Sequence, residues 1–334
     1  SSAASDVYKR QAYGLLDNLT YTLTGNQLSC VEDAVSTAAY GTNTAFVNGA
    51  SAAGEYAYDV NGNLTKDLNK GIADIQYNVL NLPSTVSFSD GSTITYTYGA
   101  DGTKLRTVHK IGSTTTTTDY CGNVIYENGT QKLLLTEEGY INLAGTQQYH
   151  YYLKDHQGNN RVVINQSGTV EETNHYYPFG GVFGTTGNTQ PYKYNGKEFD
   201  NKKGLNWYDY GARHYDTALG RFTTNDRFAE KYYSMSPYQY GANSPVVNID
   251  VNGDSIRICT ETQSFGHTWI SVGEGSNMTV YSYGRYNGTN KGPDRSSNSL
   301  GNGSGVLLKL MGDEAKAYND KKSSWWNVCI CSNR

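Results

Sequence analysis

The stretch that decides the fold is STITYTYGADGTKL, residues 92–105. Its first half alternates apolar or aromatic residues with threonine at a period of two, which is typical of a strand with one buried face. The Gly-Ala-Asp-Gly that follows favours a tight turn, because glycine tolerates positive φ and aspartate binds neighbouring backbone amides. Lys104 and Leu105 then begin a return strand. The stretch therefore predicts a β-hairpin.

The same arrangement recurs through the first half of the chain. Tyr58–Leu64 reads YDVNGNL, Tyr77–Pro83 is a degenerate copy, and Tyr21–Leu28 is a fainter one. The turn tyrosines of successive copies, from Tyr58 to Tyr98, are 19 and 21 residues apart. One hairpin cannot bury its apolar face alone, so the copies are expected to join into one extended sheet. We predict a mainly-β fold, with antiparallel hairpins in a curved or partial shell and a small α+β C-terminal domain.

Composition excludes several classes of protein. Of 334 residues, 37% are hydrophobic and 17% are charged, with 37 Gly and 30 Tyr. A helix bundle would need more Leu, Ala, Glu and Lys, and a disordered chain would hold fewer of the tyrosines that favour half-buried strands. There is no apolar run near the length of a membrane span. The net charge of −4 argues against a nucleic-acid partner.

Neither a metal nor a cofactor is predicted. Asp59 and Asp250 each begin a run that resembles the start of a calcium loop, but Leu64 and Ser255 occupy the sixth position, where that loop needs glycine. These runs are interpreted as turns. The five cysteines include no Cys-x-x-Cys pair, which argues against a zinc site.

Both ends indicate a fragment of a longer protein. Residues 1–11 (SSAASDVYKRQ) have no hydrophobic period and are interpreted as a non-native scar, and no signal peptide is visible. The chain stops shortly after Trp325 and Trp326, without a closing strand.

From residue 152 onward the repeat gives way to a series of tyrosine- and glycine-rich motifs. In order they are YLKDHQGNNR (152–161), YYPFG (176–180), YNGKE (194–198), GLNWYDYGARHYD (204–216), GRFTTND (220–226), SPYQYGANSP (236–245) and IDVNG (249–253). With the repeats before it, this series resembles the Rhs (rearrangement hotspot) or YD-repeat family, the carriers of bacterial polymorphic toxins, over about residues 50–254.

The resemblance implies an architecture and a context. Residues 12–150 would be a YD-repeat sheet, 151–254 the Rhs-associated core domain that plugs the shell, and 255–334 a truncated variable effector. The implied partners are this effector, an immunity protein and secretion machinery. The implied location is outside a bacterium or on its surface, and the implied use is competition between cells.

The family also implies self-cleavage at the end of the core. Many members cut themselves with two aspartates and one arginine, which by motif correspond to Arg213, Asp226 and Asp250. Two carboxylates held close together cannot both ionise readily, so one can act as an acid while the other activates water. A guanidinium would hold one carboxylate ionised. The expected cut lies near residues 253–255.

This sequence departs from the family pattern at that site. Arg227 and Val251 stand where the family has proline, and Asp254 stands where an apolar residue is usual. An extra carboxylate beside the cut could disturb the charge balance of the pair. The alternative is that Asp226 and Asp250 only cap turns, and that Arg213 is a buried anchor.

After Gly253 the tyrosine-turn repeat stops. The runs 266–273 and 279–286 predict strands, residues 292–305 a flexible loop, and residues 313–318 a helix. The Gly-His-Thr-Trp motif is similar to one in permuted papain-like (NlpC-type) hydrolases. This resemblance would make His267 a general base for a cysteine nucleophile. Cys329 and Cys331 do not follow the helix-opening turn that such a nucleophile needs.

Three functions thus remain open from the sequence. The first is a structural carrier with an effector and a self-cleaving core. The second is the hydrolase itself. The third, weaker one is a cell-surface repeat protein that binds glycans through its tyrosines.

Overall fold

The chain, seen in a computed structural model, divides into two compact units. The first is Ser1–Asp226 with Ser236–Gln239, and the second is Arg227–Met235 with Tyr240–Arg334. The described residues are 16–35, 45–50, 54–231, 233–254, 257–260, 268–272, 279–284, 306–311 and 313.

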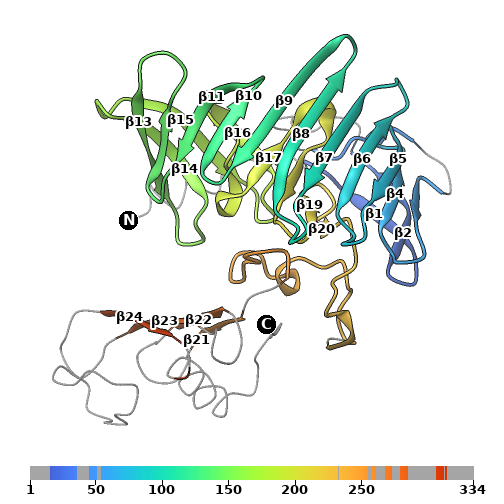
Figure 1. The fold of residues 1–334 in the computed structure, drawn as a ribbon. Coiled ribbons are helices and arrows are strands. Elements are labelled where there is room, and N and C mark those ends of the chain that lie inside the picture. The colour runs from blue at the N-terminus through green and yellow to red at the C-terminus, as the bar shows by residue number, and fades with distance from the viewer. Residues whose placement is uncertain are drawn as a thin grey trace, which may run out of the picture. The chain divides into compact units, whose positions relative to one another are not determined.

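One antiparallel sheet of 14 strands makes up most of the first unit (Figure 1). Its strands lie in chain order, from β3 at one edge to β16 at the other, so each pairs with the strands before and after it. The sheet is open, and the predicted mainly-β fold of consecutive hairpins is confirmed. Its strands are β3 (Tyr56–Tyr58), β4 (Leu64–Asp67), β5 (Ile72–Tyr77), β6 (Pro83–Phe88), β7 (Thr93–Tyr98), β8 (Lys104–Ile111), β9 (Thr114–Cys121), β10 (Val124–Glu127), β11 (Thr130–Leu135), β12 (Gly139–Asn142), β13 (Gln148–Lys154), β14 (Asn160–Asn165), β15 (Val170–Tyr176) and β16 (Val182–Thr186).

The repeated turns share one backbone geometry. In the first copy the Asp59 amide donates to the Asn63 carbonyl (2.9 Å) and the Gly62 amide donates to the Asp59 carbonyl (3.0 Å). Gly62 has φ +79°, and Gly102 takes the same place with φ +86°. The degenerate copy has Asn81 there, with φ +58°. Asparagine tolerates this left-handed conformation better than most residues, so the copy that lost its glycine keeps the turn.

Two smaller sheets complete the first unit. An N-terminal hairpin forms a two-stranded sheet, and several of the Rhs-like motifs form a four-stranded antiparallel sheet. The strands of the hairpin are β1 (Leu19–Thr24) and β2 (Gln27–Asp33). The four-stranded sheet comprises β17 (Glu198–Asp200), β18 (Trp207–Asp209), β19 (His214–Asp216) and β20 (Arg221–Phe222), with the short 3-10 helices η1 (Tyr194–Gly196) and η2 (Lys202–Gly204) beside it.

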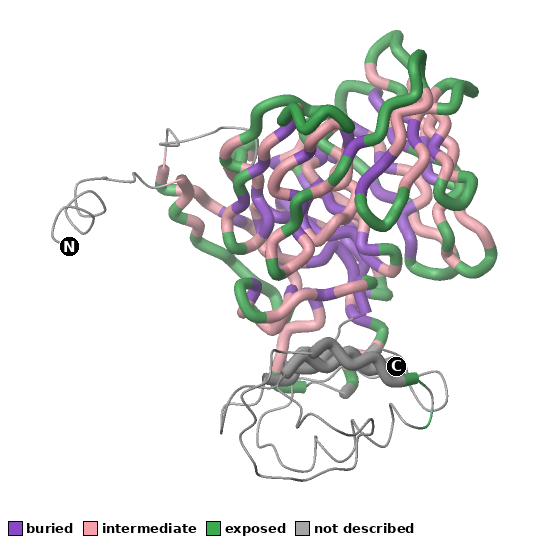
Figure 2. Tube along the Cα trace, turned by 90° about the vertical axis from the view of Figure 1, so that its left-hand side faces the viewer, coloured by how far each residue is buried: buried purple, intermediate pink, exposed green. Residues whose placement is uncertain are grey.

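The main hydrophobic core lies between the large sheet and the motifs of the four-stranded sheet. Alternate residues of the repeat strands pack with side chains from residues 205–219 in one buried cluster. Figure 2 shows the buried positions gathered inside this unit, while the hairpin turns are exposed. The cluster comprises Leu28, Val31, Tyr56, Leu64, Ile72, Ile75, Val86, Phe88, Ile94, Tyr96, Leu205, Trp207 and Leu219. A second cluster holds Ile125, Leu133, Tyr140 and Val163.

The second unit contains a separate four-stranded antiparallel sheet in chain order. A strand is present within each of the predicted runs 266–273 and 279–286, whereas the predicted loop at 292–305 and all but the first residue of the predicted helix lie outside the described residues. Its elements are η3 (Ala229–Lys231), η4 (Gly241–Asn243), β21 (Arg257–Thr260), β22 (Thr268–Val272), β23 (Thr279–Gly284) and β24 (Val306–Met311). In neither unit do the described residues include a helix long and apolar enough to cross a membrane.

Candidate functional site

The Tyr-Pro-Phe-Gly motif is held by three tyrosines from two other motifs. The carbonyls of residues 178, 179 and 180 accept hydrogen bonds from the hydroxyls of Tyr194 (2.9 Å), Tyr215 (2.9 Å) and Tyr208 (3.4 Å), respectively. Gly180 has φ +90°, and a Cβ at this position would lie 2.6 Å from the Tyr194 ring. These three tyrosines are therefore structural, because each buries its ring and uses its hydroxyl to satisfy a backbone carbonyl.

Arg213 and Asp226, two of the three residues expected to act in self-cleavage, are in contact. Arg213 Nη2 lies 3.1 Å from Asp226 Oδ2, and both side chains are buried. Arg213 Nη1 donates to the Pro237 carbonyl (3.1 Å), and the guanidinium lies 3.7 Å from the centre of the Phe222 ring. The Asp226 amide also donates to the Pro237 carbonyl (2.9 Å). Two bonds to one carbonyl fix the arginine and the aspartate relative to each other.

Asp250, the third of these residues, belongs to the second unit. Its carboxylate is buried and caps its own turn, with Oδ1 accepting from the amides of Asn252 (3.2 Å) and Gly253 (2.7 Å). This is the capping geometry that the alternative interpretation expects. The pairing of Asp226 with Asp250 stays a prediction.

The two residues that depart most from the family pattern pair with each other. Arg227 follows Asp226 in the chain, Asp254 follows Gly253, and a guanidinium nitrogen of Arg227 contacts Asp254 Oδ2. The extra carboxylate beside the expected cut is thus accompanied by an extra cation.

His267 and its candidate partners Cys329 and Cys331 lie outside the described residues. The strand β22 begins at Thr268, directly after His267. The general-base role of His267 stays a prediction.

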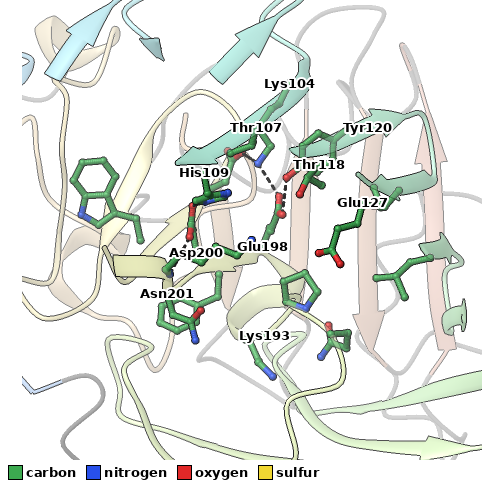
Figure 3. Close-up of a pocket in the computed structure, with 18 of the residues that line it drawn as sticks. Lys104, Thr107, His109, Thr118, Tyr120, Glu127, Lys193, Glu198, Asp200 and Asn201 are labelled. Carbon is green, nitrogen blue, oxygen red and sulfur yellow. Dashed lines mark hydrogen bonds and ion pairs between the residues drawn. The ribbon is translucent and has the colours of Figure 1, made fainter. Parts of the chain in front are cut away.

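A polar cavity of about 220 Å³ lies between the large sheet and the four-stranded sheet, at a place that no sequence motif indicated. Lys104 is its central cation, with Nζ 2.7 Å from Glu198 Oε2 and 2.5 Å from Asp209 Oδ2 (Figure 3). The Tyr120 hydroxyl donates to the other oxygen of Glu198 (2.7 Å). These contacts join β8 and β9 to β17 and β18.

The charges in this cavity hold one another ionised. Burial would raise the pKa of Asp209, but the Lys104 ammonium keeps this pKa well below its usual range. Burial would likewise lower the pKa of Lys104, but Asp209 and Glu198 hold it well above normal. His214 itself is buried, which lowers its pKa and favours the neutral imidazole.

The same wall carries a histidine–carboxylate pair. His109 Nε2 lies 2.7 Å from Asp200 Oδ2. His109 is 6% exposed, and its Nδ1 is buried without a hydrogen-bond partner. In the neutral tautomer that donates from Nε2 to Asp200, Nδ1 is an acceptor without a donor.

Sequence reasoning missed this cavity because the pattern of β8 is misleading. The strand buries the polar residues Thr107 and His109 and leaves Leu105 exposed, which reverses the usual alternation. The ion-pair partners of Lys104 in this strand, Glu198 and Asp209, lie about a hundred residues further along the chain, so no local spacing could connect them. The only available signal was an apolar pattern in 104–111 that does not keep a period of two.

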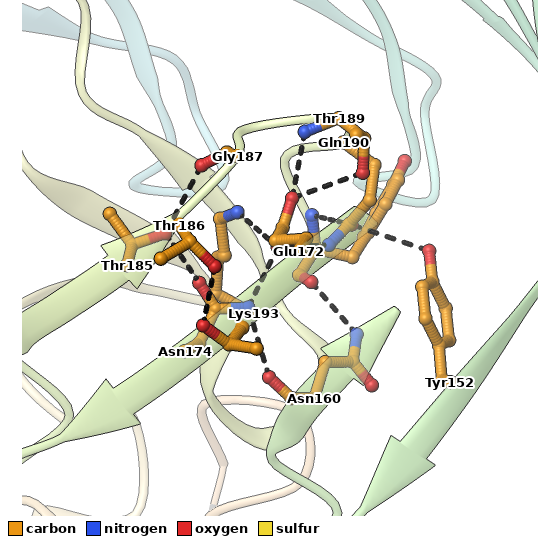
Figure 4. A network of polar contacts seen from close by, with 12 residues as sticks. Tyr152, Asn160, Glu172, Asn174, Thr185, Thr186, Gly187, Thr189, Gln190 and Lys193 are labelled. Atoms are coloured by element: carbon orange, nitrogen blue, oxygen red, sulfur yellow. Dashed lines mark hydrogen bonds and ion pairs between the residues drawn. The ribbon is translucent and has the colours of Figure 1, made fainter. Parts of the chain in front are cut away.

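A second polar cluster in the same unit surrounds the carboxylate of Glu172 (Figure 4). Glu172 is 0% exposed and accepts hydrogen bonds from Lys193 Nζ (2.5 Å), Asn174 Nδ2 (2.7 Å), the Thr189 amide (2.7 Å) and Gln190 Nε2 (3.1 Å). Burial alone would raise the pKa of Glu172, but the Lys193 charge and these donors lower it. The cluster ties the connection between β16 and β17 to β15 and is structural.

Comparison with known proteins supports the fold. No family model matches the chain. Salivary gland surface protein 1 of Aedes aegypti is 34% identical over 224 residues, which cover 59% of this chain and 6% of that protein. The chain therefore corresponds to a small part of this relative.

Solved structures of toxin complexes are similar in fold. The crystal structure of TcdB2–TccC3 matches with a TM-score of 0.54 and 19% identity, over 70% of this chain and 13% of that one. The complex TcdB2–TccC3–Cdc42 matches with a TM-score of 0.53 and 19% identity, and the Tc holotoxin pore of Photorhabdus luminescens, which carries a TccC3 mutation, with 0.53 and 18%. Each match covers 70% of this chain and 13% of the other. The chain thus has the β-rich, Rhs-like fold of these toxin proteins.

Proposed function

We propose that this chain is a segment of an Rhs-like toxin carrier. The large sheet would be a stretch of the carrier wall, residues up to 254 would include its plug, and residues 255–334 would be the effector that it carries out of a bacterial cell. The observation that supports this most is the open sheet of 14 strands in chain order, whose fold resembles that of TccC3-containing toxins. Such a sheet can be extended at either edge by further hairpins, as a longer wall requires.

Limited proteolysis of the full chain tests the carrier. Val163 is fully buried in the cluster of β10–β14, whereas Val170 is 55% exposed at the start of β15. In Val163→Asp the charge is buried and should disrupt the sheet, while Val170→Asp leaves the sheet folded. We expect mass spectrometry to find residues 255–334 cut slowly in wild type and V170D and rapidly in V163D. Equal rates in all three would show that the wall does not shield the C-terminal region.

We further propose that Arg213, Asp226 and Asp250 cleave the chain near residues 253–255, which would release the effector. The buried contact of Arg213 with Asp226, held at the Pro237 carbonyl, supports the first half of this site. One carboxyl group would protonate the leaving amide nitrogen while the other, ionised, would activate the water that attacks the carbonyl. The Arg227–Asp254 pair supplies a counter-charge for the carboxylate next to the expected cut.

Intact mass spectrometry tests the cleavage separately from the carrier. Wild type should split near residues 253–255, while Asp226→Asn and Asp250→Asn should remain whole. Asp101→Asn, at an exposed turn of the repeat, is the matched control and should split like wild type. If wild type remains at full mass, the two aspartates only cap turns and the self-cleavage proposal fails, whatever the proteolysis shows.

A further inference from the structure

The cavity of the first unit holds several buried polar atoms without a partner. Tyr96 Oη, His109 Nδ1 and His214 Nδ1 belong to residues that line it, and none of the three atoms has a hydrogen-bond partner. Buried polar groups are almost always hydrogen-bonded, so unpartnered ones that meet at one cavity call for a group that occupies it. Glu172 and the four residues that donate to it have no such atoms, although Asn160 Oδ1 beside them has no partner.

The charges of the lining give no net attraction to an anion or to a cation. Four lysines and four acidic side chains line the cavity, so their formal charges cancel. Several of them are already paired, as Lys104 is with Glu198 and Asp209. A charged ligand would have to compete with these pairs. A neutral ligand with many hydroxyl groups can instead donate to carboxylates and to His109 Nδ1 and accept from the hydroxyl of Tyr96.

The size and the walls restrict the ligand further. At about 220 Å³ the cavity exceeds the roughly 30 Å³ share of one water and is smaller than the roughly 300–1,000 Å³ of pockets for drug-sized ligands. The aromatic rings of Tyr96, Tyr120, Phe199 and Trp207 are also part of its lining. Aromatic faces beside charged hydrogen-bonding groups suit a ring that has apolar C–H faces and a polar edge.

We propose that this cavity, between β8–β9 and β17–β18, binds a neutral polyhydroxylated molecule of monosaccharide size. His109 is the residue that receives it: Asp200 accepts from Nε2 and so leaves Nδ1 as an acceptor for a ligand hydroxyl. The site is independent of the carrier function and of the self-cleavage, because it contains none of the residues Arg213, Asp226 and Asp250.

Saturation-transfer NMR and titration calorimetry on the full chain test this site. The probes are glucose, galactose, mannose and N-acetylglucosamine, with sodium succinate as an anionic control and ethylammonium chloride as a cationic one. We expect at least one sugar to bind and both ions to fail. Binding of an ion alone, or of no probe at millimolar concentration, would overturn the proposal.

Two variants assign the binding to the cavity. His109→Phe removes the free acceptor and should weaken binding by about tenfold or more, the effect of one good hydrogen bond. Thr118→Phe narrows the cavity from β9, where the residue is partly exposed and an aromatic side chain suits a strand. It keeps the proposal testable if H109F does not fold.

The matched control is His150→Phe. His150 is a buried histidine that pairs with a carboxylate in the same sheet, with Nε2 2.8 Å from Glu171, but it does not line the cavity. H150F should bind the sugar like wild type. Equal binding by wild type, H109F and T118F would place the sugar elsewhere, and a crystal soaked in the sugar that shows only ordered water in the cavity would also overturn the proposal.

Discussion

Two carboxylates of the first unit, Glu172 and Asp67, are equally buried but differ in their hydrogen-bond partners and in their pKa. Glu172 is 0% exposed and Asp67 is 1% exposed. Glu172 faces a lysine and several hydrogen-bond donors, and its pKa is lowered. Asp67 accepts from the Lys70 amide (3.2 Å) through Oδ1, while its Oδ2 has no partner. Burial raises the pKa of Asp67 to about 6, against the lowering by Lys70 and with a further rise from Asp216.

The difference shows that donors, and not depth, decide what a buried carboxylate does. Glu172 is stabilised in its charged form because its oxygens are saturated, so its charge helps to hold the fold. Asp67 lies beside a cavity of about 200 Å³ and near a second carboxylate, Asp216. Lys70 Nζ forms its ion pair with Asp216 Oδ2 (3.2 Å) and not with Asp67. The charge of Asp67 is therefore a cost to the fold at neutral pH.

The largest effect should come from removing the cation of the saturated cluster. Lys193→Met leaves Glu172 buried without its counter-charge and should lower the free energy of unfolding by about 3–5 kcal/mol. Urea denaturation at pH 7 measures it. Lys132→Met is the control, because its pair with Glu127 (2.6 Å) is largely exposed and should contribute about 1 kcal/mol or less. Equal losses in the two variants would show that burial of the Glu172 cluster has no energetic consequence.

The unsaturated carboxylate should give a smaller effect of the opposite sign. Because the folded-state pKa of Asp67 is raised, the fold is most stable below pH 4 with respect to this group and loses stability as the pH rises through about 6. Asp67→Asn keeps the acceptor for the Lys70 amide and removes the titration. At pH 7 it should stabilise the chain by about 2–3 kcal/mol, with little change at pH 4.

Thermal unfolding of wild type and D67N across pH 4–7 makes this measurement. Asp90→Asn serves as the control, since the hydrogen bond from Lys203 lowers the pKa of Asp90 to about 2 at an exposed position. Its contribution has the other sign: it is present above the unfolded pKa and is lost only as the pH falls towards 2. A stability difference between D67N and wild type that does not change with pH would contradict the raised pKa.

The smallest effect should come from a single neutral hydrogen bond. Tyr215→Phe removes the donor to the Phe179 carbonyl while the ring stays packed, and should cost about 1 kcal/mol. Tyr149→Phe, at a half-exposed position of β13, should change the melting temperature little. If the two variants have the same melting temperature, the tyrosine hydroxyls at the Tyr-Pro-Phe-Gly motif do not stabilise the fold.

The hairpins were predictable because each is a local event. A period-two run, a turn with Asp or Asn, and a glycine or asparagine that adopts positive φ lie within about 14 residues, as at Thr93–Lys104. Their order in the sheet followed too, since consecutive hairpins pair with their neighbours in the chain. Of the candidate site, motif comparison indicated Arg213 and Asp226, and their contact is present.

The polar interior could not be predicted in this way. Lys104 resembles a solvated strand residue, and His109 and Thr107 occupy positions that a period-two rule would leave in water. They are buried because the four-stranded sheet, more than 90 residues later, covers this part of the large sheet with Glu198, Asp200 and Asp209.

By itself the sequence thus determined the repeated turns, the strands and the mainly-β class, because turn chemistry and side-chain alternation act between neighbours in the chain. The tertiary structure alone decided which carboxylates are saturated, which are not, and where a polar cavity remains. The physical reason is that a buried charge is stabilised by the donors that surround it in space, and those donors come from strands that only the folded chain brings together.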